Sequence, residues 1–361
     1  MVGLEDPIRE EVKDAINECK QAGIHVLLIT GDYEKTAKTV AEKLGIDARK
    51  VVLGHEIEEM SKEDLQGRVK YIEVFARATP EHKLKIVEAL KANGEQVAVT
   101  GDGINDAPAL KRADIGVAMG QTGTDVAREA SDMVLLDDNF ATITLSVKEG
   151  RKLYDNLKKG VRYYLAVKLA LIVIFLLPVL FNIQLPFAPI QIILLELFMD
   201  LAASATFVIE PSESDVMERT PRDPEEKFMD FRMNLWILLG ALSLIGAVLS
   251  IYFGFYWLGP DIARTMAFGT WMVTHVFLAL NMRTEEDPII EVGILSNKAM
   301  IIWGVGAIAA MFVIMYVPAL QTVFRVVSLN FLEWLVIFGV SIGTTFWIEV
   351  VKVLIQRRFS K

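Results

Sequence analysis

The strongest chemical signal in the chain lies between residues 100 and 110. Two aspartates, Asp102 and Asp106, flank Asn105 in the stretch TGDGINDAPAL, which directly follows an apolar run at 96–99. A carboxylate at the C-terminal end of a parallel strand can bind Mg²⁺, and the N-terminus of the next helix favours a phosphoryl group. The alternative is an ordinary turn rich in Gly, Asn and Asp. The full eleven-residue pattern favours a magnesium and phosphate site.

These eleven residues resemble the hinge signature of the P-type ATPases, the cation pumps whose phosphorylation domain belongs to the haloacid dehalogenase superfamily. Further segments match the family in the same order, so the resemblance covers essentially the whole chain. They are DPIR at 6–9, where Ile8 departs from the family's proline, TGD at 30–32, FARATPEHK at 75–83, DIGVAMG at 114–120 and ASDMVL at 130–135.

The resemblance implies roles for the residues of this site. Asp102 would bind Mg²⁺, Asp106 would support the loop, and Arg77 resembles a residue near the nucleotide, ATP. The residues implied to position and neutralise phosphoryl oxygens are Thr30, Gly31, Lys83 and Asn105, and Asp32 is a further expected cofactor-binding residue. Phosphoryl transfer needs such a set, because a cation, a lysine and N–H groups stabilise the charge that spreads over the oxygens. Lys83 taken alone would be interpreted as a solvated lysine at a helix end.

The residue that the family phosphorylates does not occur in this sequence. It is the first aspartate of a DKTGT motif, and the TGES loop, the nucleotide-binding domain and the first four membrane helices are absent too. We therefore expect the C-terminal portion of a pump, inactive alone and partnered by an N-terminal half that carries the nucleophile. In the family the nucleophile's strand is central, which predicts an unpaired slot in the sheet. A truncated gene product is another interpretation.

Two other classes of function stay open. A non-catalytic membrane subunit or regulator would bind pump-like partners, and an upstream reading frame encoding DKTGT would favour a split pump over this class. A membrane-anchored phosphatase would need its own aspartate nucleophile, and none is visible in the sequence. A split or partial pump is therefore the preferred interpretation.

The composition divides the chain into a head and a membrane part. Hydrophobic residues make up 53% and the mean hydropathy is +0.38, with the apolar excess concentrated after about residue 160. We expect a remainder of the phosphorylation domain at 1–140, a linker helix at 141–162 and a cation-transport domain at 163–361. The net charge of −9 argues against nucleic acid as a main partner. The single cysteine, Cys19, cannot form an internal disulfide.

In the head, helices alternate with short apolar strands. This alternation predicts a doubly wound α/β domain with a parallel sheet, which the resemblance implies is an incomplete haloacid dehalogenase-like fold. Such a sheet carries its chemistry at the C-terminal ends of its strands. Thr30, Asp32 and Asp102 fall at such ends, and Lys83 begins a helix beside them. We therefore expect these side chains to converge around one bound anion.

Hydrophobic runs in the second part predict an all-α bundle of six transmembrane helices in a lipid bilayer. The runs are 163–181, 187–208, 233–258, 262–282, 299–318 and 330–354. Lys and Arg gather before the first run, between the second and third, and at the chain end, whereas the opposite loops hold only Arg264 and Arg325. The positive-inside rule therefore predicts a cytoplasmic head and C-terminus. We expect the membrane to be the plasma membrane.

Ionisable residues within these runs indicate an ion path, because a charge in the bilayer is costly unless it is paired or hydrated. Glu196 and Asp200 stand four residues apart on one helix face, and they resemble carboxylates of the family's sixth membrane helix that bind transported cations. Lys168 would be a fixed internal cation beside them, or it reaches the interface instead. His275 is a further site residue or a core histidine bonded to a carbonyl.

This set of residues favours a proton or a monovalent cation as the transported ion. Calcium prefers about six to eight hard oxygens, and Leu171 and Met199 stand where calcium pumps of the family carry oxygen ligands. The expected function is thus part of an ATP-driven pump that works through an aspartyl-phosphate cycle. A calcium-transporting ATPase is the alternative.

Overall fold

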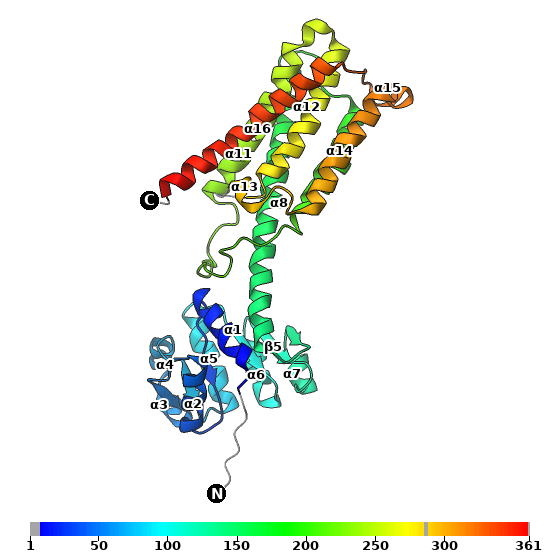
Figure 1. Cartoon of the computed structure of the whole chain (residues 1–361). Coiled ribbons are helices and arrows are strands. Elements are labelled where there is room, and N and C mark those ends of the chain that lie inside the picture. The colour runs from blue at the N-terminus through cyan, green and yellow to red at the C-terminus, as the bar shows by residue number, and fades with distance from the viewer. Residues whose placement is uncertain (1–7, 285–287, 360–361) are drawn as a thin grey trace. The chain divides into compact units, whose positions relative to one another are not determined.

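The computed structural model describes residues 8–284 and 288–359, with side chains as far as residue 354 (Figure 1). Asp6 and Pro7 of the DPIR segment lie outside the described residues. The chain divides into two compact units. Unit 1 comprises Met1–Gly150 and Ser214–Arg222, and unit 2 comprises Arg151–Glu213 and Asp223–Lys361.

Unit 1 is an α/β domain, which confirms the predicted fold class. Its strands are β1 (Leu28–Ile29), β2 (Val51–Leu53), β3 (Val74–Ala76), β4 (Ala98–Gly101), β5 (Ile115–Met119) and β6 (Met133–Leu135). Its helices are α1 (Glu10–Gln21), α2 (Glu34–Leu44), α3 (Gly54–Glu59), α4 (Lys62–Val69), α5 (Pro80–Ala92), the 3₁₀ turn η1 (Ile104–Asp106), α6 (Ala107–Arg112) and α7 (Asp125–Glu129). The sequence did not predict α7.

The described strands form two parallel three-stranded sheets, ordered β1-β3-β2 and β4-β5-β6. The N–H groups of Leu28 and Thr30 donate to β3, at Glu73 O (2.8 Å) and Phe75 O (3.0 Å). Because N–H groups alternate in direction along a strand, the N–H of Ile29 points away from β3. No described strand pairs with the outer edge of β1 or of β4. The sheet is therefore divided between β1 and β4.

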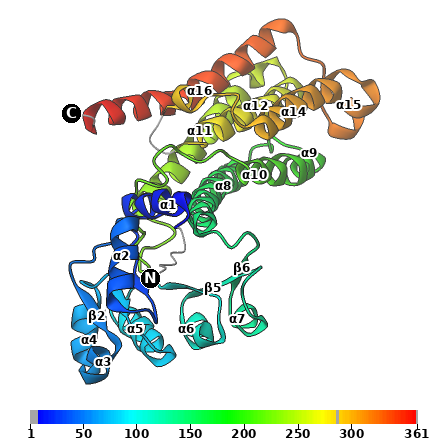
Figure 2. The same ribbon diagram turned by 60° about the horizontal axis from the view of Figure 1, so that its bottom comes forward.

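Helices cover one face of the second sheet. Figure 2 shows α6 and α7 on the same side of β5 and β6. Buried Leu110, Ala118 and Ala127 form the contact, and half-buried Val99 packs against them. On the other face Ala98 and Thr100 of β4 are exposed, although a central strand of a doubly wound sheet is covered on both faces. One face of β4 thus has no covering layer in the described chain.

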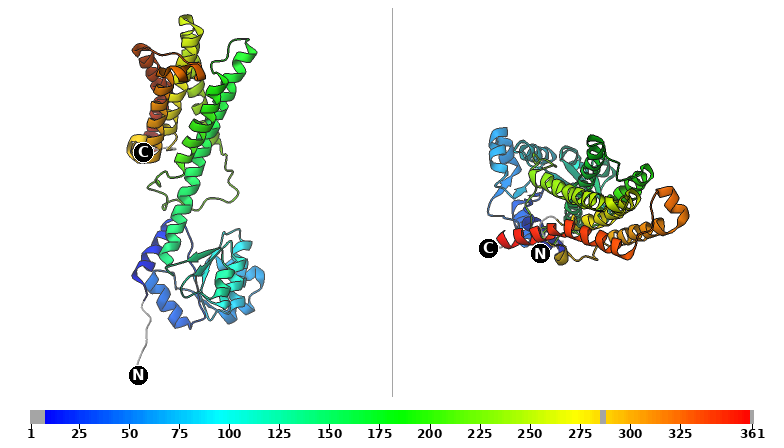
Figure 3. Two further views of the ribbon diagram at one scale, coloured as in Figure 1. Left: turned by 90° about the vertical axis from the view of Figure 1, so that its right-hand side faces the viewer. Right: turned by 90° about the horizontal axis from the view of Figure 1, so that it is seen from above.

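Unit 2 is a helical bundle. Its elements are α8 (Phe140–Leu180, which begins in unit 1), α9 (Pro189–Leu194), η2 (Leu195–Asp200), α10 (Leu201–Phe207), α11 (Phe231–Gly254), η3 (Tyr256–Leu258), α12 (Pro260–Asn281), α13 (Ile289–Val292), α14 (Lys298–Tyr316), α15 (Pro318–Phe324) and α16 (Phe331–Phe359). The helix α8 is continuous over 41 residues (Figure 3). Residues 141–162, predicted as a linker helix, form its first half.

Five segments of the described chain are long and apolar enough to cross a membrane. They are Phe140–Leu180, Pro189–Phe207, Phe231–Leu258, Lys298–Tyr316 and Phe331–Leu354. The sequence predicted a sixth span at 262–282, where α12 is long enough but less apolar. Most of α12 is buried by other helices, including Thr265, Thr270 and Thr274. A helix surrounded by protein can carry such polar groups, because its neighbours, not lipid, satisfy them.

A carboxylate in the turn after β6 holds the turn that follows β5. Asp138 Oδ1 accepts the N–H groups of Gly120 (2.7 Å) and Gln121 (2.9 Å). Its Oδ2 accepts the N–H of Thr122 (2.7 Å) and the Thr122 hydroxyl (2.8 Å). These hydrogen bonds, that of Gln121 first, lower the pKa of Asp138 from 3.8 to about 2. The turn is therefore stabilised by the ionised form of Asp138.

We expect Asp138→Asn to destabilise the head at neutral pH. Because the pKa of Asp138 is lower in the folded chain than in the unfolded chain, the carboxylate stabilises the fold above about pH 4, and this contribution is lost as the pH falls toward about 2. Thermal midpoints of wild type and variant should therefore differ at neutral pH and converge in acid. Asp14→Asn, at an exposed position of α1, is the control. A difference between the two thermal midpoints that stays constant with pH would contradict the prediction.

Candidate functional site

The loop after β4 exposes one carboxylate. Asp102 is exposed, and its backbone carbonyl accepts the N–H of Thr124 at 2.8 Å, which ties the loop to the residue before α7. A Cβ added at Gly101 would lie only 2.4 Å from the Cβ of Asp106, so the loop requires glycine there. No ion pair within the described chain engages the Asp102 carboxylate. Its oxygens are therefore available to a cation.

Lys83 and Asp106 form an ion pair beside this loop. Lys83 Nζ lies 2.5 Å from Asp106 Oδ1, and the Asp106 side chain is 9% exposed. Asp106 Oδ2 also accepts the N–H of Gly103 at 3.3 Å. Asp106 thus connects the lysine of α5 to the backbone of the loop. The Lys83 ammonium is therefore held beside the loop that carries Asp102, and it stays partly exposed.

His82, which the sequence pattern did not single out, fixes the first turn of α5. Its Nδ1 accepts the N–H of Thr79 at 3.2 Å, and its Nε2 lies 3.0 Å from Glu58 Oε1 on α3. The side chain of His82 is buried. Thr79 before Pro80 was the available signal, because a threonine followed by proline marks the start of a helix. His82 therefore orients the helix turn that carries Lys83.

A second group of the predicted residues lies at the ends of β1 and β3. The hydroxyl of Thr30 accepts the N–H of Asp32 at 3.1 Å, and Asp32 O accepts the N–H of Arg77 at 2.9 Å. Arg77 has a left-handed backbone (φ +56°), and its guanidinium lies 4.0 Å from the ring centre of Tyr33. Gly31 lies exposed between Thr30 and Asp32.

The loop with Asp102 and Asp106 follows a strand of the second sheet, whereas Thr30, Asp32 and Arg77 follow strands of the first. No hydrogen bond or ion pair within the described residues joins Thr30 or Asp32 to Lys83 or Asp102, so their convergence around one anion stays a prediction. Asn105 is exposed in η1. An exposed carboxylate, a lysine and a glycine-containing loop are the groups that Mg²⁺ and phosphoryl oxygens require. The residues present therefore fit both Mg²⁺ and the phosphates of ATP.

In unit 2, Lys168 of α8 lies between two carboxylates. Its Nζ forms ion pairs with Glu196 Oε2 and, at 2.7 Å, with Asp200 Oδ2. The Lys168 side chain is 20% exposed, Glu196 40% and Asp200 1%. Lys168 also lies 5.0 Å from the ring centre of Tyr164. Lys168 is thus paired with both carboxylates of η2.

His275 of α12 approaches the other face of Asp200. Its Nε2 lies 3.5 Å from Asp200 Oδ1, and both side chains are buried. In the described chain, Asp200 Oδ1 and both ring nitrogens of His275 lack a hydrogen-bond partner, as does the hydroxyl of Tyr163. The Tyr163 ring packs against His275, with centroids 5.3 Å apart. Buried polar atoms without partners here fit a site that takes up a cation or water.

Both carboxylates lie on a π-helical turn, η2. A π-helix widens the helix locally, and such turns occur often at functional sites. The sequence placed Glu196 and Asp200 on one face from α-helical spacing, and in the structure both reach the same lysine. It did not predict the π-helical turn or the contact of Tyr164 with Lys168.

Two protein families match the chain. A family described as "haloacid dehalogenase-like hydrolase" matches residues 1–114, and one described as "Cation transporting ATPase, C-terminus" matches residues 184–354. The site residues of the head fall within the first match. Glu196, Asp200 and His275 fall within the second.

Curated relatives match nearly the whole of this chain. A "Calcium-transporting ATPase" of Bacillus subtilis is 41% identical over 95% of this chain and 39% of the relative. "Calcium-transporting ATPase type 2C member 1" of Bos taurus is 36% identical over 98% of the chain and 37% of the relative. "Calcium-transporting ATPase 1" of Saccharomyces cerevisiae is 37% identical over 94% of the chain and 37% of the relative.

The fold and the matches define an integral membrane protein with a haloacid dehalogenase-like head. The chain belongs to the family of P-type cation-transporting ATPases, and it corresponds to the C-terminal portion of such a pump. It spans about two-fifths of the length of the curated relatives that it matches.

Proposed function

We propose that this chain forms part of an ATP-driven pump that carries Ca²⁺ across a membrane. The observation that carries the proposal is the cluster of Lys168, Glu196 and Asp200 within a bundle of apolar helices, in the same chain as a haloacid dehalogenase-like head. The sequence alone favoured a proton or a monovalent cation. The names of the relatives favour the calcium alternative instead.

Lys168 would compete with the transported ion for the same oxygens. Its ammonium occupies Glu196 Oε2 and Asp200 Oδ2, which leaves Glu196 Oε1 and Asp200 Oδ1 for a cation. Calcium needs about six to eight oxygens, so it would also displace the ammonium or recruit backbone carbonyls and water. Lys168 would therefore act as an internal counter-ion that neutralises the carboxylates when no cation is bound.

In the head, we assign the handling of phosphate to the residues around the β4 loop. Asp102 would hold Mg²⁺, which when bound supplies positive charge to the phosphoryl oxygens of ATP. Asp106 would keep the ammonium of Lys83 beside that loop, and Thr30 and Asn105 would donate hydrogen bonds to phosphoryl oxygens. The aspartate that accepts the phosphoryl group would belong to the N-terminal part of the pump. The continuous helix α8 would transmit a conformational change of the head to Lys168.

The N-terminal part of the pump would pair with the open edges of the two sheets. β1 and β4 each have a described partner on one side only, and one face of β4 is exposed. One parallel strand inserted between them would join the two sheets into one and satisfy the outward N–H of Ile29. The partner would thus complete the fold as well as the active site.

This pairing predicts protection from hydrogen exchange. We expect the amides of Ile29, Ala98 and Thr100, which point to the open edges, to exchange at least about ten-fold more slowly once the N-terminal part is bound, because each backbone hydrogen bond must open before exchange. Mass spectrometry of the full chain with and without that part measures the change. The amides of Val51–Leu53, at the far edge of the first sheet, serve as the control. A complex that forms without protecting Ile29 would contradict the pairing.

A proton is the second candidate for the transported ion, and Lys168 is the observation that favours it. A fixed ammonium between two carboxylates already balances part of their charge and leaves little room for a divalent ion, whereas a proton needs no shell of about six to eight oxygens. We place the head on the cytoplasmic side and propose the plasma membrane, because Lys and Arg gather at the predicted cytoplasmic loops.

The test uses an assembled pump in which this chain replaces the matching part of the Bacillus subtilis relative. ATPase activity in lipid vesicles is measured with Ca²⁺, monovalent cations and protons as the varied ion. We expect Ca²⁺ to stimulate the rate. An ATPase rate that rises only with proton concentration would identify the proton as the transported ion. An assembled pump that forms but hydrolyses no ATP would favour a non-catalytic regulator instead.

A further inference from the structure

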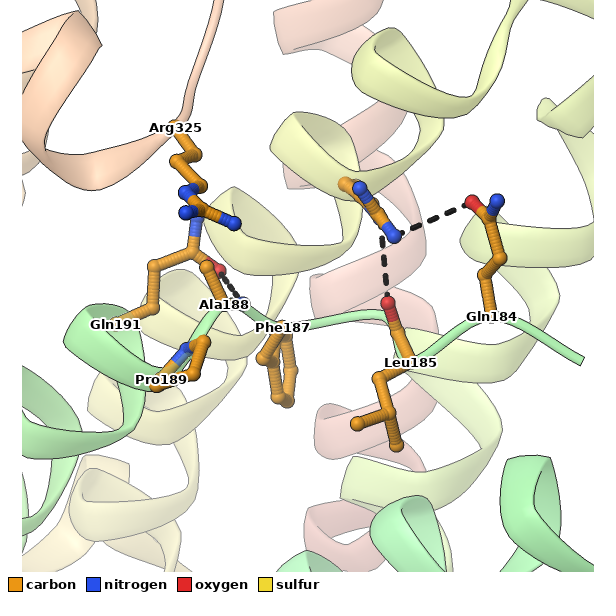
Figure 4. A pocket seen from close by; sticks show the side chains of 8 residues that line it. Gln184, Leu185, Phe187, Ala188, Pro189, Gln191 and Arg325 are labelled. Carbon is orange, nitrogen blue, oxygen red and sulfur yellow. Dashed lines mark hydrogen bonds between the residues drawn. The ribbon is translucent and has the colours of Figure 1, made fainter.

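A cavity of about 280 Å³ lies in unit 2, and no residue of the cluster around Lys168 lines it. It is formed by the loop between α8 and α9, the start of α9, α12 and the residue after α15. Its lining residues are Gln184, Leu185, Phe187, Ala188, Pro189, Gln191, Arg264 and Arg325. Figure 4 shows the side chain of Arg325 extended toward Ala188 and Gln191. Segments far apart in the sequence therefore bring two arginines to one cavity.

Two arginines line this cavity, and no acidic side chain lines it. None of the lining residues is acidic, and Asp261, one turn before Arg264 on α12, does not line the cavity. Arg264 donates from Nε to Leu185 O and from Nη2 to Gln184 Oε1, both at 3.2 Å, which leaves Nη1 for a ligand. Within the described residues, no ion pair engages Arg325. The two guanidinium groups therefore favour an anion.

The wall beside Arg325 is held together by hydrogen bonds of one buried side chain, Gln191. Gln191 is 1% exposed, its Nε2 donates to Phe324 O at 2.9 Å, and its Oε1 accepts the N–H of Ala188 at 2.9 Å. These bonds fix the start of α9 to the end of α15. Arg325 itself has a left-handed backbone (φ +52°) directly after α15. The position of the second arginine is thus set by the fold.

We propose that this cavity binds the phosphate group of an anionic phospholipid, from the leaflet at the Leu180 end of α8. Guanidinium groups bind phosphate oxygens through paired N–H donors. Apolar side chains are exposed at or near the lining residues in the sequence. They are Ile183 and Leu185 before α9 and Val323 on α15. They offer a surface to acyl chains that a soluble anion would not use. The ammonium of a zwitterionic head group would meet no acidic side chain in the lining.

The test compares lipids bound to the purified full chain in detergent. Native mass spectrometry measures the retention of phosphatidylglycerol against phosphatidylcholine with the same acyl chains. We expect wild type to prefer phosphatidylglycerol, and Arg325→Gln to reduce that preference by about five-fold, as does Arg264→Gln. The side chain of Arg325 makes no hydrogen bond in the described chain, so its variant should fold normally. Arg325→Lys keeps the charge and should retain most of the preference.

Lys298→Gln is the matched control, because it removes an exposed cation from the start of α14. It should leave the lipid preference unchanged. Equal retention of the two lipids by wild type would overturn the proposal, and so would a preference that survives the loss of both arginines. Inorganic phosphate that stabilises the lipid-free chain through the same arginines would assign the cavity to a soluble anion instead and overturn the lipid assignment.

Discussion

Asp102→Asn is expected to lower the ATPase rate of the assembled pump by about a hundred-fold or more. The substitution removes the one exposed carboxylate at the end of β4, and with it the proposed ligand of Mg²⁺. Loss of one group that stabilises transition-state charge costs about a hundred- to a thousand-fold in rate. The measurement is steady-state ATP hydrolysis at saturating Mg²⁺ in lipid vesicles.

Two controls separate this effect from misfolding. Asp14→Asn changes the same charge at an exposed position of α1 and should leave the rate unchanged. Thermal unfolding should be nearly the same in both variants, because no ion pair of the described chain holds the Asp102 carboxylate. A folded Asp102→Asn pump that retains more than about a tenth of the wild-type rate would show that this carboxylate does not hold the metal.

The second large effect is expected from Lys168→Gln. In the assembled pump this change should raise the apparent affinity for Ca²⁺ by about ten-fold or more. A unit charge and a doubly charged ion at about 4 Å repel by about 8 kcal/mol at an effective dielectric constant of about 20. Relief of only about a sixth of that energy changes an affinity about ten-fold. The Ca²⁺ concentration that half-activates ATP hydrolysis measures the change.

The fold must be checked in this case, because the variant leaves Glu196 and Asp200 without their shared partner. Loss of one partner from a buried ion pair destabilises a protein by about 3–5 kcal/mol. Adding Asp200→Asn to Lys168→Gln removes one of the two facing charges and should restore part of the stability. Lys298→Gln is the control for charge. A half-activating Ca²⁺ concentration that is unchanged in a folded Lys168→Gln pump would refute the competition between lysine and calcium.

Local patterns in the sequence were enough to position most elements of the head. The residues Thr79 and Pro80 mark the start of α5, and α2 ends at Gly45, whose φ is +76°. Pairing between strands was harder to predict, because it depends on residues far apart in the chain. The positions of β1 and β4 followed from apolar runs, but the division into two sheets depends on which strands are present to pair.

In the membrane part, the sequence predicted the charged residues better than their surroundings. Spacing placed Glu196 and Asp200 on one face, and the pairing with Lys168 was one of two outcomes considered. The π-helical turn could not be predicted, because the shift of its hydrogen bonds depends on the packing of neighbouring helices. The buried ion pair of Arg283 with Glu210 was missed for a similar reason, since 73 residues separate them.

The cavity with Arg264 and Arg325 could not be predicted from the sequence either. Both arginines were visible in the sequence as the few basic residues of the loops opposite the head. Their approach to one cavity depends on the hydrogen bonds of Gln191 with Ala188 and Phe324. A buried glutamine carries no signal in a sequence that would predict such bonds.

The most direct test of the central claim is ATP-driven uptake of radioactive Ca²⁺ into sealed vesicles that contain the assembled pump. The account predicts uptake by wild type and a loss of at least about a hundred-fold in Asp200→Asn, because Asp200 is the buried carboxylate of the cation site. Lys298→Gln vesicles should take up Ca²⁺ at the wild-type rate. Undiminished uptake by a folded Asp200→Asn pump would contradict the account.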